Sequence, residues 1–119
     1  MKRQTILSAF KNAFNGLWYF FRHERNGQVQ SCAAIITIAF AIWLHVSAMQ
    51  WVLLLLCIGA VLSLEMINSS LEKLCDLVHK DYHPVIKIVK DVSAAAVLFA
   101  SAISVTIACI IFLPKMFLL

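Results

Sequence analysis

The sequence predicts an all-α integral membrane protein, a single domain over residues 1–119 with an amphipathic surface helix and three transmembrane helices. Three observations support this fold class. First, 62% of the 119 residues are apolar and 13% are charged, against roughly 25% charged in a soluble globular domain. Second, the chain contains two long runs without a charged residue. Third, all six acidic residues lie outside those runs.

The composition excludes an ordinary soluble domain. Small domains bury only about 60–70% of the surface that the unfolded chain exposes, so a chain this short cannot cover so much apolar surface in water. At 13.4 kDa the chain also has no room for a separate soluble nucleotide-binding domain. The net charge of +4 is not concentrated in a dense basic cluster. We therefore expect it to reflect membrane topology and expect no nucleic-acid partner.

The first predicted helix covers residues 5–22. Lys11, Asn12, Asn15 and Arg22 lie on one side, and apolar residues recur on the other at spacings of three and four. These apolar residues are Ile6, Leu7, Phe10, Phe14, Leu17, Trp18 and Phe21. Such a helix is expected to lie in the membrane interface rather than cross the bilayer.

Two helices follow, predicted at 28–46 and 49–78. The 39 residues from Asn26 to Leu64 carry no charge, and one membrane span needs about 20 residues. The run therefore holds one complete span and most of a second. We place the break at a short polar stretch between two interfacial tryptophans; the residues concerned are Trp43, His45, Ser47, Gln50 and Trp51.

A fourth helix is predicted at 85–113. It follows a polar connector that ends at Pro84, and proline disfavours helical conformation in the residue before it. The helix begins with a charged turn and continues as a charge-free run of 23 residues from Val92 to Pro114, which Lys115 closes. This run is long enough to cross a bilayer.

The basic residues predict the topology. They occur in the N-terminal segment and around the second connector, whereas the first connector has none. These residues are Lys2, Arg3, Lys11, Arg22 and Arg25, and Lys73, Lys80, Lys87 and Lys90. Because basic residues collect in cytoplasmic loops, we expect a multi-pass membrane protein with a cytoplasmic N-terminus.

A stripe of polar residues marks the predicted cytoplasmic half of the 49–78 helix. At about 100° per residue, Glu65, Asn68, Glu72 and Asp76 fit within an arc of roughly 80°, and Lys73 points elsewhere. Like charges on one face repel, and a charge near hydrocarbon costs several kcal/mol unless it is paired. A protein keeps such a stripe when it binds cations or titrates.

The position of Glu65 favours a functional site. A solvated helix end explains Asp76 reasonably, but Glu65 directly follows the apolar run Leu53–Leu64. Lys90-Asp91 and Glu24 lie on the same predicted side of the membrane. Carboxylates suit Mg²⁺, a lysine suits phosphate, and a carboxylate at the membrane edge can take a proton from a lipid hydroxyl. The residues therefore indicate a metal- or phosphate-handling site at the inner surface.

The segment Glu65-Met66-Ile67-Asn68-Ser69-Ser70-Leu71-Glu72, followed by Asp76 and Lys90-Asp91, resembles the signature of the prokaryotic diacylglycerol kinase family, which includes undecaprenol kinases. The resemblance covers nearly the whole chain and includes Glu24-Arg25-Asn26. It implies a homotrimeric lipid kinase of the bacterial cytoplasmic (inner) membrane, with active sites shared between neighbouring chains. The implied reaction is Mg²⁺- and ATP-dependent phosphorylation of a membrane lipid alcohol, undecaprenol or diacylglycerol.

The same resemblance implies a role for each site residue. Glu65 is similar to the family's general base, and Glu24 and Glu72 look like its metal-binding carboxylates, which also contact the nucleotide. Asn68 and Asp76 match polar residues that line the site. The implied nucleotide-binding residues of the connector and the fourth helix are Asp81, Tyr82, His83, Lys90 and Asp91.

The chain departs from the family pattern in two places. Some members carry Gly-Ser two residues after Lys-Asp, where this chain has Ser93-Ala94, and some carry a basic residue near the position of Thr5. Both departures concern contacts with the lipid, so the acceptor stays open. The stretch from His83-Pro84 to Lys90-Asp91, with Pro114-Lys115, resembles undecaprenol kinases more than the diacylglycerol-specific branch.

Two other functions fit the sequence less well than a lipid kinase. A small proton-coupled multidrug transporter is also short and apolar, but it needs a carboxylate deep within a span, and here the charge-free runs are uninterrupted. A noncatalytic membrane subunit would not need Lys90-Asp91 opposite an acidic stripe. With only three glycines the chain cannot form a glycine-rich phosphate loop. Phosphoryl transfer needs mainly positioning and charge neutralisation, which metal ions, a lysine and a base can supply.

Overall fold

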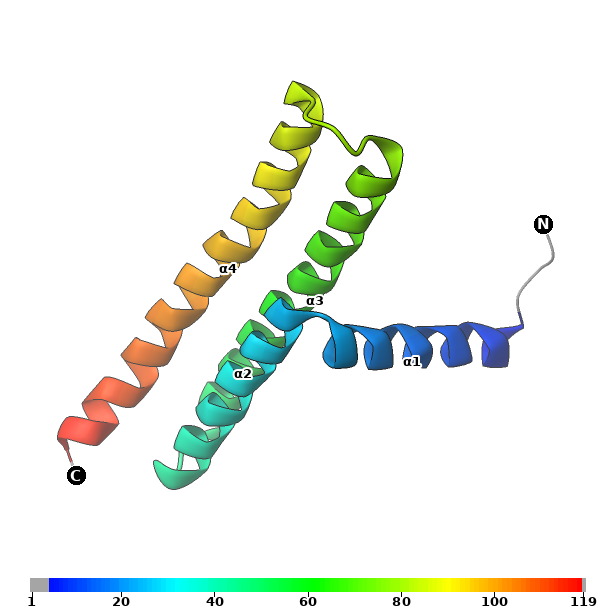
Figure 1. The fold of residues 1–119 in the computed structure, drawn as a ribbon. Coiled ribbons are helices and arrows are strands. Elements are labelled where there is room, and N and C mark those ends of the chain that lie inside the picture. Colours follow the sequence, from blue (N-terminus) through cyan, green and yellow to red (C-terminus); the bar gives the residue numbers. More distant parts are fainter. Residues whose placement is uncertain (1–4, 119) are drawn as a thin grey trace.

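A computed structural model describes residues 5–118 and confirms the all-α fold class (Figure 1). Its four helices are α1 (Ile6–His23), α2 (Arg25–Trp43), α3 (Ala48–Val78) and α4 (Pro84–Phe117). Lys2 and Arg3, two of the basic residues used to predict the topology, lie outside the described residues.

The helices α2, α3 and α4 form a bundle, from which α1 projects to one side (Figure 1). The most extensive contact is between α3 and α4, with α2 packed mainly on α3. Among the residues of α1 that are described, only Phe20 is buried. The first helix is therefore joined to the bundle at its C-terminal end alone.

The exposed apolar side of α1 fits a helix that lies in a membrane interface. Its first turn is capped by Thr5, whose hydroxyl oxygen accepts a hydrogen bond from the Ser8 backbone N–H at 3.1 Å. Leu7 and Trp18 are 82% and 71% exposed. Large apolar side chains without protein contacts are costly in water, but they are stabilised between lipid headgroups and acyl chains.

A glycine allows α1 and α2 to meet at a sharp corner. Glu24 is the single residue between the two helices, and the Phe20 ring, 4% exposed, packs directly against Gly27. A Cβ atom at position 27 would lie 2.6 Å from Phe20 Cζ, well inside van der Waals contact. The corner thus depends on the absence of a side chain at Gly27.

The turn between α2 and α3 is fixed by backbone and side-chain caps. His45 has a positive φ of 52°, and the Val46 N–H bonds to the Ala41 carbonyl at 3.3 Å, the arrangement of a Schellman motif. Ser47 and Gln50 then form a reciprocal capping box at the start of α3. Because of these caps, the helix predicted to end at residue 46 ends at Trp43.

The other helix bounds also differ from the prediction. The second helix begins at Arg25 rather than residue 28, because the chain turns at Glu24 alone. The fourth helix was predicted to end at 113 but continues through Pro114 to Phe117. Proline removes one backbone donor, but Pro114 still accepts a hydrogen bond from the Leu118 N–H at 3.1 Å. Pro114 therefore lies within the last turn instead of ending the helix.

The apolar core lies at the end of the bundle opposite the α3–α4 connector. Ala41, Val46, Leu54 and Ile111 form a buried cluster there, whereas most other large apolar side chains face outward. Within residues 5–118, α3 and α4 are long and apolar enough to cross a membrane. The α2 helix is not among these candidates; its first six residues include Arg25, Asn26, Gln28 and Gln30. These features fit a helical membrane protein.

We predict that Gly27→Ala destabilises the protein, because the new methyl group must displace the Phe20 ring. Overpacking of this kind costs typically about 1–3 kcal/mol. Gly16→Ala is the matched control: a Cβ atom there meets nothing within 4 Å, and the site lies within α1. In a helix interior, alanine is favoured over glycine by roughly 0.5–1 kcal/mol.

Thermal unfolding in detergent tests the pair, with a lower melting temperature for Gly27→Ala and an unchanged or higher one for Gly16→Ala. Equal effects of the two variants would contradict the role given to the Phe20 contact.

Candidate functional site

The predicted polar stripe on α3 runs from the buried part of the bundle to its surface. Glu65 and Asn68 are each 3% exposed, Glu72 is partly buried, and Asp76 is exposed. Asn68 Nδ2 donates a hydrogen bond to Glu72 Oε1 at 3.4 Å, so these residues meet as their spacing of four predicts. Glu65 is thus the acidic residue of the stripe most removed from solvent.

Glu65 opens onto a cavity of about 370 Å³ between α2, α3 and α4. Asn68 and Glu72 line it from α3, and Asn26 and Gln30 line it from α2. The carboxylates of Glu72 and Glu24 are the like charges that act on Glu65. The cavity therefore combines acidic oxygens with amide groups that can donate hydrogen bonds to them.

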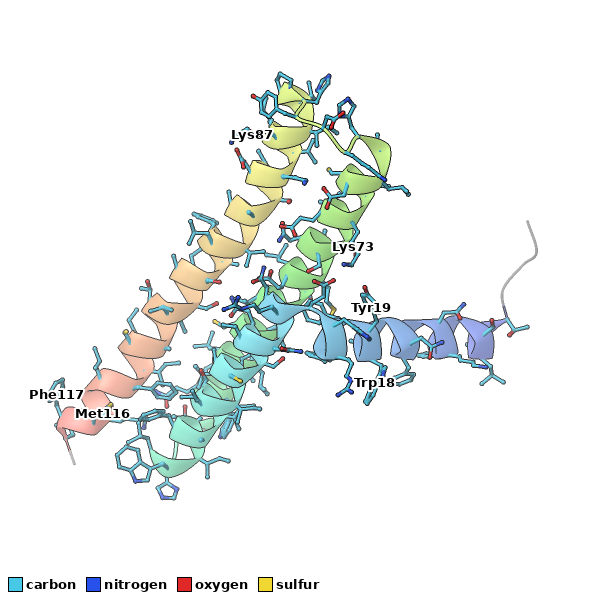
Figure 2. All side chains as sticks on the ribbon, viewed as in Figure 1. Trp18, Tyr19, Lys73, Lys87, Met116 and Phe117 are labelled. Atoms are coloured by element: carbon cyan, nitrogen blue, oxygen red, sulfur yellow. The ribbon has the colours of Figure 1, made fainter. Side chains whose placement is uncertain are left out.

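Glu24 is held beside this cavity by a lysine on the neighbouring helix. Lys73 Nζ lies 2.7 Å from Glu24 Oε1, and the Glu24 side chain is 20% exposed. Lys73 is thus the group that compensates the burial of this carboxylate oxygen. The same ammonium lies 5.6 Å from the centre of the Tyr19 ring, and Figure 2 shows Lys73 and Tyr19 facing each other.

The predicted nucleotide residues gather at a second cavity, of about 340 Å³, formed by the α3–α4 connector and the start of α4. Its polar lining comprises Asp81, Tyr82, His83, Lys90 and Asp91, together with His79, Lys80 and Lys87. The connector is ordered by its two histidines. His79 Nδ1 bonds to the Asp81 carbonyl at 2.8 Å, and His83 Nδ1 accepts the Val85 N–H at 3.1 Å, which caps α4.

An ion pair joins the two groups of residues. Lys90 Nζ, on α4, lies 2.5 Å from Asp76 Oδ1, on α3. Asp91, the other member of the predicted pair, bonds instead to Lys87 at 2.6 Å, one turn earlier on the same helix. Lys90 and Asp91 therefore face different partners, and Lys90 is the one that connects α4 to the acidic stripe.

The structure does not contain a cage of metal ligands. Within residues 5–118 no group of three or more His, Cys, Asp and Glu side chains is placed to hold a metal ion. The predicted ligands Glu24 and Glu72 both lie close enough to act electrostatically on Glu65. One or two carboxylates completed by substrate phosphates is the arrangement that Mg²⁺ commonly uses, whereas Ca²⁺ takes six to eight oxygens.

Sequence reasoning gave no role to several side chains that the structure places at the site. Gln30 lines the Glu65 cavity. The sequence feature that could have indicated this is its spacing of four residues from Asn26 within a charge-free run. Ser93 Oγ donates to Asn68 Oδ1 at 2.6 Å, and its signal was its position one turn after Lys90. Lys73 does point away from the stripe as expected, but it reaches Glu24, which spacing along one helix cannot reveal.

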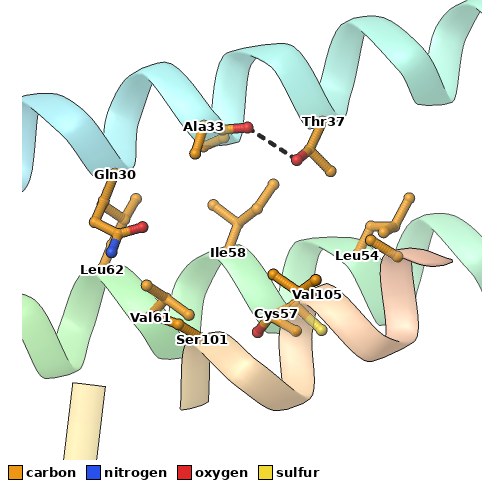
Figure 3. A pocket seen from close by; sticks show the side chains of 13 residues that line it. Gln30, Ala33, Thr37, Leu54, Cys57, Ile58, Val61, Leu62, Ser101 and Val105 are labelled. Carbon is orange, nitrogen blue, oxygen red and sulfur yellow. Dashed lines mark hydrogen bonds between the residues drawn. The ribbon is translucent and has the colours of Figure 1, made fainter. Parts of the chain in front are cut away.

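A smaller groove continues from the Glu65 cavity into the apolar part of the bundle. It encloses about 130 Å³ between α2, α3 and α4 (Figure 3). Gln30 and Ser101 line both spaces. The Ser101 hydroxyl is buried without a hydrogen-bond partner in the part of the chain that the structure describes. The groove therefore adjoins the Glu65 cavity at Gln30 and Ser101, and its walls are mainly apolar.

Comparisons with known proteins agree on one family. The family model described as prokaryotic diacylglycerol kinase matches residues 11–112. A protein named undecaprenol kinase from Bacillus subtilis (strain 168) is 36% identical over 93% of this chain and 90% of its own length. A protein named diacylglycerol kinase from Synechocystis is 34% identical over 94% of this chain and 65% of its own length. Another protein of that name, from Escherichia coli K12, is 30% identical over 89% of this chain and 87% of its own length.

We predict that Lys73→Met lowers the melting temperature by several degrees, because it leaves the partly buried Glu24 carboxylate without a compensating charge. Lys87→Met is the matched control, since both partners of the Lys87–Asp91 pair are more than half exposed and exposed pairs contribute little. Thermal unfolding of both variants in detergent measures the difference. A drop for Lys73→Met no larger than for Lys87→Met would contradict this reading.

Proposed function

Since the chain belongs to the prokaryotic diacylglycerol kinase family and is a lipid kinase, we propose that it transfers the γ-phosphoryl group of Mg-ATP to the hydroxyl of undecaprenol or diacylglycerol. We place this reaction at the cytoplasmic face of the bacterial inner membrane. The observation that carries the proposal is the burial of Glu65 beside Asn68 and Glu72, directly after an apolar run. A lipid hydroxyl and a phosphate can meet only at such a boundary.

Glu65 acts as the general base in this proposal. Its carboxylate takes the proton of the lipid hydroxyl while the hydroxyl oxygen bonds to the γ-phosphorus and the bond to ADP breaks. The products are a lipid monophosphate, ADP and a proton on Glu65, which solvent then removes. The amides of Asn26 and Asn68, which share the cavity, orient the carboxylate and stabilise its charge.

Glu24 and Glu72 would hold Mg²⁺ in the same proposal. Their hard oxygen donors fit this ion, and the absence of a three-ligand cluster within residues 5–118 fits an ion completed by phosphate oxygens. When bound, the ion neutralises phosphate charge. Lys73 would then share Glu24 with the metal and keep the local charge balanced.

The connector would bind the nucleotide. Lys90 and Lys87 supply positive charge for phosphate oxygens, and Asp81, His83 and Asp91 supply polar contacts around the same cavity. Tyr82 is 75% exposed there and presents a ring on which a base can stack. Asp76 would hold Lys90 in place until the phosphates replace it.

The lipid would reach Glu65 by lateral diffusion along the groove that shares Gln30 and Ser101 with the Glu65 cavity. We place undecaprenol first among the acceptors. The sequence resemblance from His83 to Asp91 favours it, and the Bacillus subtilis relative is named undecaprenol kinase. Diacylglycerol is the alternative, since the other two relatives are named diacylglycerol kinase.

We further propose three membrane spans, a cytoplasmic N-terminus, and a homotrimer with sites shared between chains. The charged and amide residues of α2 are confined to its first two turns, so the rest of this helix can enter the bilayer. The outward-facing apolar side chains of the bundle can contact lipid or further copies. The transporter alternative is set aside, because the family consists of lipid kinases.

We predict that purified protein transfers label from γ-labelled ATP, with Mg²⁺, to at least one of undecaprenol and diacylglycerol. Glu65→Gln should lower the transfer rate by about 10²–10⁴-fold, the range that general bases contribute. Glu65→Asp keeps a carboxylate and should retain more activity than Glu65→Gln. Size-exclusion chromatography checks that all three proteins assemble alike.

Two results of this assay count against the proposal. If wild-type protein labels neither lipid, the proposed reaction is wrong. If Glu65→Gln keeps full activity, the reaction stands but another group is the base.

We also predict a detergent-corrected mass of three chains of 13.4 kDa each by light scattering. If sites are shared between chains, dilution into detergent that yields monomers should abolish transfer, and reassembly should restore it. A monomer with full activity would exclude shared sites while leaving the reaction itself intact.

A further inference from the structure

Asn68 is a buried amide between the acidic residues and α4. On one side its Nδ2 donates to Glu72 Oε1 at 3.4 Å, and its amide also lies beside the Glu65 carboxyl. On the other side its Oδ1 accepts a hydrogen bond from the Ser93 hydroxyl at 2.6 Å. Asn68 is 3% exposed, so both contacts are largely shielded from bulk solvent.

The chemistry of the neighbours fixes which way the amide points. Ionised carboxylates only accept hydrogen bonds, and Nδ2 is the only donor of an asparagine side chain. The Nδ2 end must therefore face Glu65 and Glu72, which turns Oδ1 toward α4. A reversed amide would set a carbonyl oxygen against two carboxylates. The favourable orientation thus requires a donor on α4, and Ser93 supplies it.

Among the residues that line the groove between α3 and α4 at this level, no other polar side chain can replace Ser93. An apolar groove of about 420 Å³ lies where α3 and α4 meet at this level, and Asn68 and Ser93 are the only polar residues among those that line it. The Ser93 hydroxyl has a single proton and lies nearer to Asn68 Oδ1, at 2.6 Å, than to the Lys90 carbonyl one turn earlier on α4, at 3.0 Å, so it donates to Asn68. Without Ser93, the buried Oδ1 would lose its donor.

We propose that Ser93 is a positioning residue, which orients the Asn68 amide so that its N–H groups face the Glu65 and Glu72 carboxylates. This inference rests on the proposed function of Glu65 as the base. It also assigns a role to a residue that differs within the family, because this chain has Ser93-Ala94 where some members have Gly-Ser. Ser93 itself touches neither substrate nor nucleotide in this role.

The kinetic test compares three variants in the lipid-phosphorylation assay. Ser93→Ala should lower kcat by roughly 5–50-fold, the loss expected when a buried acceptor loses its partner, with the KM for ATP changed by less than about 2-fold. Ser93→Thr should restore kcat, because threonine keeps a hydroxyl on the same Cβ atom that can donate to Asn68 Oδ1. Thr106→Val removes an α4 hydroxyl that bonds only to the Ala102 carbonyl, and should leave kcat unchanged.

A second measurement does not depend on activity. In protein labelled with ¹⁵N asparagine, the side-chain amide signals of Asn68, assigned by their loss in Asn68→Ala, should shift in Ser93→Ala and return in Ser93→Thr. On the Asn68→Ala background, Ser93→Ala should have no further effect on kcat. Melting temperatures verify that each variant is folded.

The outcomes separate this inference from the proposed function. If wild-type protein phosphorylates a lipid but Ser93→Ala does so equally well, the positioning role is wrong and the function stands. If the Asn68 amide signals do not move in Ser93→Ala, the inference is wrong whatever the activity. If no lipid is phosphorylated but the signals shift as expected, the contact exists and the proposed function fails.

Discussion

The cost of placing a carboxylate at the edge of an apolar run governs the arrangement of this molecule. Glu65 follows seventeen helical residues of α3 that carry no charge, and it is 3% exposed. Such a group is stable only if other groups compensate its charge or its lost hydration. In the structure, amide side chains from α2 and α3 line the cavity beside Glu65, and Lys73 forms an ion pair with the nearby Glu24. The polar groups therefore converge on one end of the bundle.

This convergence divides the bundle into two parts with different kinds of cohesion. At the far end, Ala41, Leu54 and Ile111 pack into an apolar cluster. At the site end, ion pairs and the Ser93–Asn68 hydrogen bond also connect the helices. Apolar contacts leave no groups that can bind phosphate, whereas charged and amide groups can exchange a protein partner for a ligand. The groups that can bind a ligand thus lie at the end of the bundle opposite the apolar cluster.

The sequence predicted the helices and the polar stripe because both follow from periodicity along one helix. The contact of Asn68 with Glu72 is of this kind. It did not predict the contacts of Lys73 with Glu24, Lys90 with Asp76 or Ser93 with Asn68, which depend on how each helix is rotated toward its neighbours. The helix bounds differed where caps and single residues decide them, as at His45 and Pro114. The chemical roles of the site residues stay predictions.

The two interhelical ion pairs, Lys73–Glu24 and Lys90–Asp76, differ in their exposure to solvent. Asp76 and Lys90 are 66% and 37% exposed, so their separation costs little. Glu24 is 20% exposed, so losing Lys73 would leave a poorly solvated charge. We infer that the connector side, with Lys90, adapts when a nucleotide binds, while the Glu65 side keeps its geometry. An enzyme that works mainly by positioning needs one fixed reactant site, and in the proposed reaction the buried residues around Glu65 provide it for the lipid.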